Sequence, residues 1–90
     1  MILRIINRGL TPALYEALRE ELDIDRSHPL GLIMHGASEI EGVMQVAQIW
    51  DSEEYARRFD EEFLRPALEA LGAPLEAEIT VFELQHLVTP

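Results

Sequence analysis

Four stretches of the chain combine apolar runs with alternating apolar and polar positions, which predicts four β-strands. They cover residues 1–7, 30–37, 43–50 and 76–88. The stretch 43–50 (VMQVAQIW) has the clearest alternation, with Met44, Val46, Gln48 and Trp50 on one face and Val43, Gln45, Ala47 and Ile49 on the other. Polar residues 38–42, between the second and third of these strands, predict a hairpin turn.

A first helix is predicted from Thr11-Pro12 to about Asp23. Thr11 offers a capping oxygen, and a proline in the first helical turn loses only an N–H that has no partner there. An apolar stripe follows at four-residue intervals, at Leu14, Leu18 and Leu22. The composition of residues 23–29 (DIDRSHP) predicts a loop after this helix.

A second helical region begins at residues 51–54, where a capping residue precedes an acidic first turn. Its aromatic residues recur every four positions, at Tyr55, Phe59 and Phe63. After Pro66 the apolar stripe changes phase by about 100°, and a proline inside a helix breaks or kinks it. We therefore expect a long helix to about Leu64 and a short second piece from near Pro66, ended by Gly72 and Pro74.

The resulting order βαββαβ predicts an α+β, ferredoxin-like fold, in which a four-stranded antiparallel sheet carries both helices on one face. The predicted strands have apolar residues on both faces. Because a small domain rarely leaves an apolar sheet face in water, we expect a second copy to cover the other face. The pattern thus predicts a homodimer that forms sheet against sheet.

The chain has 90 residues, which predicts a single domain spanning 1–90. Seventeen acidic and seven basic residues give a net charge of −10, which disfavours binding to nucleic acid or to an anionic membrane surface. The chain has no Cys, no apolar run of the length of a membrane span and no apparent leader segment. We therefore expect a soluble, cytoplasmic protein.

The third strand and the start of the second helix resemble a known family. Gln48-Ile49-Trp50 runs directly into Asp51-Ser52-Glu53-Glu54-Tyr55, and Phe59 follows. This arrangement resembles the strand-to-helix signature of the antibiotic-biosynthesis-monooxygenase-like proteins, also called dimeric α+β barrels. The resemblance implies homodimers that pair through their sheets. It also implies one of several activities, because some members are cofactor-independent oxygenases of aromatic compounds, others degrade haem, and many have no established activity.

The resemblance also points to site residues. Trp50 falls where the family places a pocket tryptophan, and Asn7 falls where it often places a polar Asn. The haem-degrading branch has an iron-ligating His on the second helix, whereas this chain has no His in residues 63–68. The resemblance therefore does not extend to haem degradation, and haem binding would need a different ligand.

Each candidate catalytic residue, namely Asn7, His35 and Trp50, also has a plain structural interpretation. Trp50 either lines a ligand pocket or packs as core. The Asn7 amide either binds a substrate oxygen or is satisfied by the turn that follows it. His35 lies in an apolar strand, where a neutral imidazole either orients or deprotonates a phenol, or is hydrogen-bonded and inert.

The functional hypothesis is a cofactor-independent, monooxygenase-like protein that binds small aromatic or polycyclic compounds. The walls of its pocket would be Tyr15, Trp50, Phe59 and Phe63. No cofactor is expected because nucleotide-binding motifs are absent. No metal is expected because the spacing of Asp23, Asp25 and His28 matches neither a Ca²⁺-binding loop nor a Zn²⁺ site. The alternative is a non-catalytic ligand-binding or dimerisation module. A continuous cavity of a few hundred Å³ reaching Trp50 would favour the enzyme, and a filled interior would favour the module.

Overall fold

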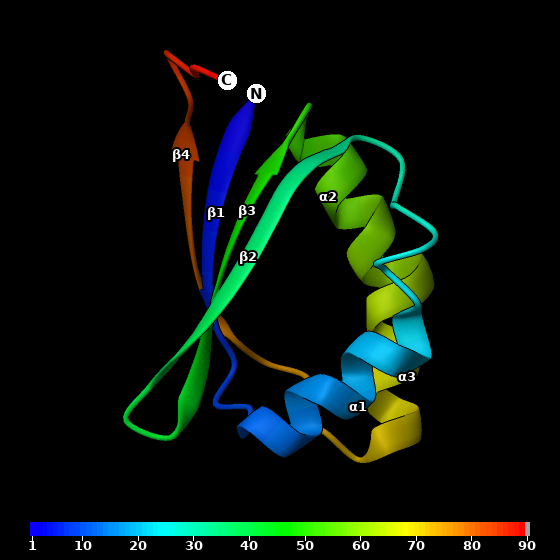
Figure 1. Cartoon of the computed structure of the whole chain (residues 1–90). Coiled ribbons are helices and arrows are strands. Elements are labelled where there is room, and N and C mark those ends of the chain that lie inside the picture. Colours follow the sequence, from blue (N-terminus) through cyan, green and yellow to red (C-terminus); the bar gives the residue numbers. More distant parts are fainter. Residues whose placement is uncertain (90) are drawn as a thin grey trace.

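The computed structural model describes residues 1–89 and consists of one antiparallel sheet with all helices on one of its faces (Figure 1). The strands are β1 (Ile2–Asn7), β2 (Leu32–Ile40), β3 (Val43–Trp50) and β4 (Glu78–Glu83), in the order β2-β3-β1-β4. The helices are α1 (Pro12–Leu22), α2 (Glu53–Phe59) and α3 (Arg65–Leu71), with a π-helical turn η1 (Asp60–Leu64) before α3. This arrangement confirms the predicted α+β, ferredoxin-like fold.

The register of the strands assigns every side chain to one of two faces. In the centre of the sheet, Arg4 pairs with Gln48 and Val81, whereas Ile5 pairs with Ala47 and Thr80. Directly paired residues share a face, and the buried Arg4, Ile6, Gln48 and Trp50 mark the face that the helices cover. The opposite face, which we call the open face, carries the alternate residues of each strand.

Two apolar clusters fill the space between the sheet and the helices. The first joins α1 to α3 and is built on Leu10, Leu18, Ala67, Leu68 and Ala73. The second joins β3 to α2 and is built on Trp50, Ala56 and Phe59. The ring centroids of Trp50 and Phe59 are 5.5 Å apart. The α1 stripe, together with Tyr55 and Phe59, thus packs in the core as the sequence pattern predicts, whereas Phe63 is exposed.

The predicted break at Pro66 is wrong, because the helix continues through this proline. Leu64 and Arg65 keep right-handed helical backbone angles, and the Arg65 N–H donates to the carbonyl of Asp60, five residues earlier. A single π-turn inserts one extra residue into the helix, which shifts the following side chains by about 100°. The phase change in the sequence is therefore real, but its cause is the π-turn η1 rather than a break.

The bounds of β2 and β4 also differ from the prediction. β2 begins at Leu32 instead of residue 30, because Gly31 has a φ of 87° and its Cα packs against the Tyr55 side chain. β2 extends to Ile40, because the hairpin turns on only two residues, Glu41 and Gly42, with φ of 52° and 82°. β4 ends at Glu83 rather than 88, opposite Ile2, the first residue of its partner strand β1.

An ion pair between a buried arginine and a partly buried aspartate links the sheet to the π-turn. The Arg4 side chain on β1 is 3% exposed, and its Nη2 lies 3.0 Å from Oδ2 of Asp60 on η1. Arg8 lies nearby and its guanidinium donates to the carbonyl of Leu75. Burial raises the pKa of Asp60, and the attraction of Arg4 opposes this effect without outweighing it.

Candidate functional site

A chain of four polar side chains crosses the covered face of the sheet. The Trp50 Nε1 lies 2.9 Å from Oε1 of Gln48, and the Gln48 Nε2 lies 3.3 Å from Nδ1 of His35. The Nε2 of His35 lies 2.8 Å from the hydroxyl of Tyr15. Three elements therefore contribute to one connected hydrogen-bond network.

The local structure of the chain explains this convergence. His35 on β2 and Gln48 on β3 are direct cross-strand partners, and Trp50 lies two residues further along the same face of β3. Tyr15 is in the first turns of α1, where the Thr11 side chain accepts from the Leu14 N–H and fixes the start of the helix. The Tyr15 and His35 rings are nearly parallel, at 4°.

The network borders a small cavity between the sheet and the helices. The cavity measures about 60 Å³, and its apolar lining includes Leu18, Leu22, Met44, Val46 and Phe59. Its polar lining consists of Arg8, Tyr15, Arg19, His35 and Gln48. Trp50 lies behind this lining and is fully buried. The interior around Trp50 is thus filled, which is the arrangement expected from the sequence for a non-catalytic ligand-binding or dimerisation module.

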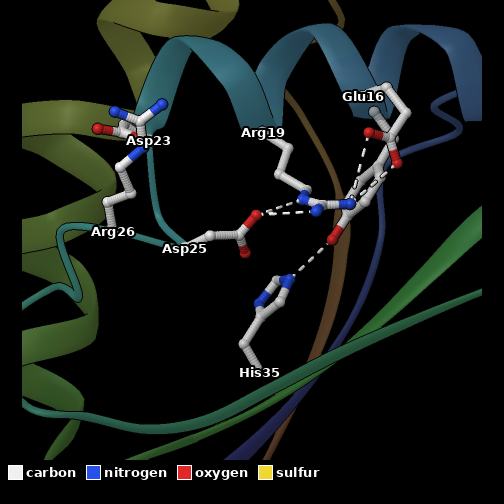
Figure 2. A network of polar contacts seen from close by, with 7 residues as sticks. Glu16, Arg19, Asp23, Asp25, Arg26 and His35 are labelled. Carbon is white, nitrogen blue, oxygen red and sulfur yellow. Dashed lines mark hydrogen bonds and ion pairs between the residues drawn. The ribbon is translucent and has the colours of Figure 1, made fainter.

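Charged side chains of α1 and of the loop that follows it lie beside His35 (Figure 2). Arg19 on α1 lies between two carboxylates, with Nη2 2.8 Å from Oδ2 of Asp25 and Nη1 3.2 Å from Oε1 of Glu16. Burial lowers the pKa of His35, with a smaller raising effect from Asp25 and a smaller lowering effect from Arg19. Burial also raises the pKa of Tyr15. At neutral pH the site therefore holds an uncharged imidazole and an un-ionised phenol.

Asn7 lies apart from the other candidate residues. It pairs with Gln45 and Glu78, so its side chain belongs to the open face. Its Oδ1 accepts from the Gly9 N–H at 3.1 Å, which is the turn interaction considered from the sequence. The structure therefore does not bring Asn7 together with His35 and Trp50.

The four residues that were expected to line the pocket, like the catalytic candidates, do not all lie together. Tyr15 and Phe59 line the cavity, whereas Phe63 is 59% exposed and lies outside it. Phe63 instead lines a groove of about 350 Å³ between the loop 27–30 and α2. Leu22 and Phe59 line both the groove and the cavity, and so form the wall between them.

The fold of this chain is similar to the folds of several solved structures. No protein-family model and no curated protein matches the sequence. Among solved structures, a Deinococcus radiodurans protein assigned as an antibiotic biosynthesis monooxygenase is 16% identical, with a TM-score of 0.70 over 100% of this chain and 98% of that one. SnoaB, a cofactor-independent oxygenase from Streptomyces nogalater, is 18% identical, with a TM-score of 0.63 over 99% and 95% of the two chains.

The chain has the fold of the antibiotic biosynthesis monooxygenases. A variant of MhuD with two manganese protoporphyrin IX molecules per active site shares this fold as well, at 16% identity and a TM-score of 0.61 over 100% of both chains. The family resemblance read from the sequence is thus confirmed by the fold of these proteins. At such low identities the likeness extends to the fold alone, and activity has to be argued from the site.

The cavity of this antibiotic-biosynthesis-monooxygenase fold does not fit a porphyrin. A volume of about 60 Å³ is far too small for a tetrapyrrole. Both ring nitrogens of His35 have protein partners, so this imidazole does not offer a lone pair to iron. The helical stretch 63–68 carries no His.

Sequence reasoning missed Gln48 as a site residue. The signal for it was an amide on the otherwise apolar face that Met44, Val46 and Trp50 share on β3. A buried amide needs partners for its oxygen and its nitrogen, and Trp50 and His35 are those partners. The pairing of β2 with β3, which brings His35 opposite Gln48, depends on the two-residue hairpin at Glu41 and Gly42.

Proposed function

We propose that this protein binds a small aromatic compound that carries a phenolic or carbonyl oxygen, with that oxygen held at Tyr15. The observation that carries the proposal is the Tyr15–His35 pair, a hydrogen-bonded polar group at the edge of a mostly apolar cavity. Apolar walls with a few fixed polar groups are typical of small-molecule sites. The cofactor-independent oxygenase SnoaB, which has the same fold, supports the proposal.

The aromatic part of the ligand enters from the groove beside α2. A cavity that admits benzene measures roughly 150 Å³, and the cavity at Tyr15 measures about 60 Å³. Leu22 and Phe59 separate it from the groove of about 350 Å³. Rotation of these two side chains joins the cavity to the groove. The ring of the ligand then lies in the groove while its oxygen reaches Tyr15. Trp50 packs on Phe59 from the other side and supports this wall.

The functional unit is a homodimer that forms through the open face. Apolar residues extend over all four strands of this face, including Leu3, Ile5, Met34, Ile40, Ile49 and Phe82. Ile5 at the centre is 42% exposed, Met34 is 52% exposed and Phe82 is 48% exposed. Burial of this surface against a second copy removes it from water and gives each sheet a cover on both faces.

A matched pair of ligands tests the binding site. We expect 1-naphthol to bind more tightly than naphthalene, because only 1-naphthol has an oxygen that hydrogen-bonds to Tyr15. Tyr15→Phe is expected to weaken 1-naphthol binding about tenfold, since one such bond contributes about 1.4 kcal/mol. The measurement is a titration followed by the NMR signals of residues around the cavity.

Naphthalene provides the internal control, because its affinity for the Tyr15→Phe variant is expected to be unchanged. Equal affinity of the unmodified protein for both compounds would contradict the proposal, and so would 1-naphthol binding that is insensitive to Tyr15→Phe. Changes in NMR signals that are confined to residues around Phe63 would show that the ligand binds in the groove without reaching Tyr15.

The second candidate function is oxygenation of the bound compound by O₂ without a cofactor. The fold shared with SnoaB favours it, whereas the filled interior around Trp50 does not. Oxygen uptake with an anthrone as substrate distinguishes the two candidates. Uptake that depends on the protein and is lost in Tyr15→Phe supports the oxygenase, and binding without uptake supports the ligand-binding module.

A further inference from the structure

We propose that Gln48 and Trp50 hold the His35 imidazole in the tautomer that carries its proton on Nε2, so that the cavity presents hydrogen-bond donors to its ligand rather than a base. The assignment of the tautomer rests on the hydrogen-bond geometry alone. The consequence for the ligand deepens the proposed function and rests on it.

The direction of the hydrogen bonds in this network follows from Trp50. An indole N–H only donates, and the Trp50 Nε1 lies 2.9 Å from Oε1 of Gln48. Both side chains are buried, at 0% and 7% exposure. Rotation of the amide by 180° would direct the Gln48 NH₂ group at the indole N–H and leave two donors facing each other without water, which costs the full desolvation of these groups. The amide oxygen therefore faces Trp50 and the amide nitrogen faces His35.

The Gln48 amide in turn fixes the proton of His35. An amide NH₂ group only donates, and the Gln48 Nε2 lies 3.3 Å from Nδ1 of His35. Nδ1 must accept this bond and is therefore unprotonated. Burial keeps the pKa of His35 below its ordinary value, so the ring is neutral at pH 7 and its single proton is on Nε2.

The bond between His35 and Tyr15 then has one possible direction. The Nε2–H donates to the Tyr15 hydroxyl oxygen at 2.8 Å, and the phenolic proton points onward. Each donor in the series acts on the next group, from Trp50 in the core to Tyr15 at the cavity. Such a series strengthens its last donor. The ligand that fits is one with a hydrogen-bond acceptor, namely a carbonyl, phenolate or enolate oxygen.

This tautomer decides between the two catalytic roles considered for His35, which are to orient a phenol or to deprotonate it. In this tautomer Nε2 has no lone pair toward the cavity, so His35 does not deprotonate a bound phenol. Its role is to orient Tyr15, and Gln48 is a positioning residue that acts through His35. Protonation of His35 would place an N–H on Nδ1 against the Gln48 NH₂ group and break the bond between them.

NMR of the ligand-free protein tests the tautomer directly. The chain has three histidines, and His28 and His86 are exposed, so a His28→Gln/His86→Gln variant leaves His35 as the single histidine signal. With ¹⁵N-labelled histidine, long-range ¹H–¹⁵N spectra distinguish a protonated ring nitrogen from a bare one. We expect a protonated Nε2 and a bare Nδ1 at pH 7. A proton on Nδ1, or an averaged mixture of both tautomers, overturns the inference.

Gln48→Glu in the same background is expected to reverse the tautomer. The new carboxylate accepts from Trp50 and from Nδ1–H of His35, so the proton moves to Nδ1 and the pKa of His35 rises by about one unit or more. The other charged or titratable groups that face His35 stay in place, namely Arg8, Tyr15, Arg19 and Asp25. Gln85→Glu is the control, because it adds the same charge at an exposed position beyond β4 and is expected to leave the tautomer unchanged.

An acceptor-only ligand completes the test. At a pH above the raised pKa of His35, we expect 1-tetralone to bind at least about tenfold more weakly to Gln48→Glu than to Gln85→Glu. In Gln48→Glu the neutral His35 has a bare Nε2, and Tyr15 donates its proton to this nitrogen instead of to the ligand. Its hydrocarbon analogue, tetralin, is expected to bind both variants equally. An Nε2–H tautomer in a protein that binds neither compound supports the assignment and contradicts the proposed function. Equal 1-tetralone affinity for both variants, with the tautomer reversed, overturns the positioning role of Gln48.

Discussion

Asp60→Ala is expected to lower the free energy of unfolding by about 3 kcal/mol or more, because it leaves the Arg4 guanidinium buried without a counter-ion. The Arg4 side chain is 3% exposed, and its Nη2 lies 3.0 Å from the carboxylate of Asp60. Arg8 adds a second positive charge nearby. A protein of this size has roughly 5–15 kcal/mol of stability in total, so the loss is a large part of it. Urea unfolding followed by Trp50 fluorescence, at fixed protein concentration, measures the effect.

Glu61→Ala is the matched control. Glu61 is the next residue on η1 and is exposed, so its removal is expected to change stability by less than about 0.5 kcal/mol. Adding Arg4→Met to Asp60→Ala is expected to recover most of the loss, since an apolar side chain then replaces the unpaired charge. Asp60→Ala that is as stable as Glu61→Ala would show that Arg4 needs no partner.

The pH dependence of stability reports the net effect of burial and of Arg4 on the Asp60 carboxyl. Its pKa in the folded protein is raised, mainly by burial, so the folded state binds this proton more tightly than the unfolded state. The contribution of Asp60 to stability is therefore highest below the pKa of an unfolded carboxyl and falls as the pH rises through the raised value. Because this shift already includes the attraction of Arg4, ionisation of Asp60 lowers stability even beside Arg4. The loss expected for Asp60→Ala comes from the buried guanidinium, which no longer has a partner.

Secondary structure was predictable from local patterns, and the exceptions have specific causes. The change of apolar phase around Pro66 was visible in the sequence, but a π-turn and a helix break produce the same pattern, and only the backbone distinguishes them. The start of β2 depends on the close approach of Gly31 to Tyr55, a contact between residues far apart in the chain. Strand alternation on β3 was predictable throughout, because it depends on side-chain parity alone.

The candidate site was only partly predictable, because it depends on cross-strand pairing. Tyr15, His35 and Phe59 were identified by residue type, and all three line the cavity. Gln48 has a role only because the β2–β3 register places it opposite His35. Asn7 was grouped with these residues by resemblance, but it shares parity with Leu3 and Ile5, and the strand register places these residues on the open face.

Ile5→Asp is expected to dissociate the proposed homodimer into monomers. Ile5 lies at the centre of the open face, between Ala47 and Thr80. A two-fold sheet-to-sheet interface would bury this carboxylate once in each copy, and each burial costs at least about 2 kcal/mol. The dissociation constant then rises by at least about 1000-fold. Sedimentation velocity over a range of micromolar concentrations measures it, with the unmodified protein expected at twice the mass of the chain.

Ile79→Asp is the control, since it makes the same substitution at the same degree of exposure on the other face of the sheet. Ile79 is 43% exposed and Ile5 is 42% exposed, but Ile79 pairs with Ile6 and lies on the helix-covered side at the β4 edge. If the open face is the interface, Ile79→Asp stays dimeric while Ile5→Asp does not. If both variants dissociate, added negative charge on a chain of net charge −10 is the cause. If the unmodified protein is a monomer throughout, the apolar open face has no second copy to cover it, and the homodimer proposal fails.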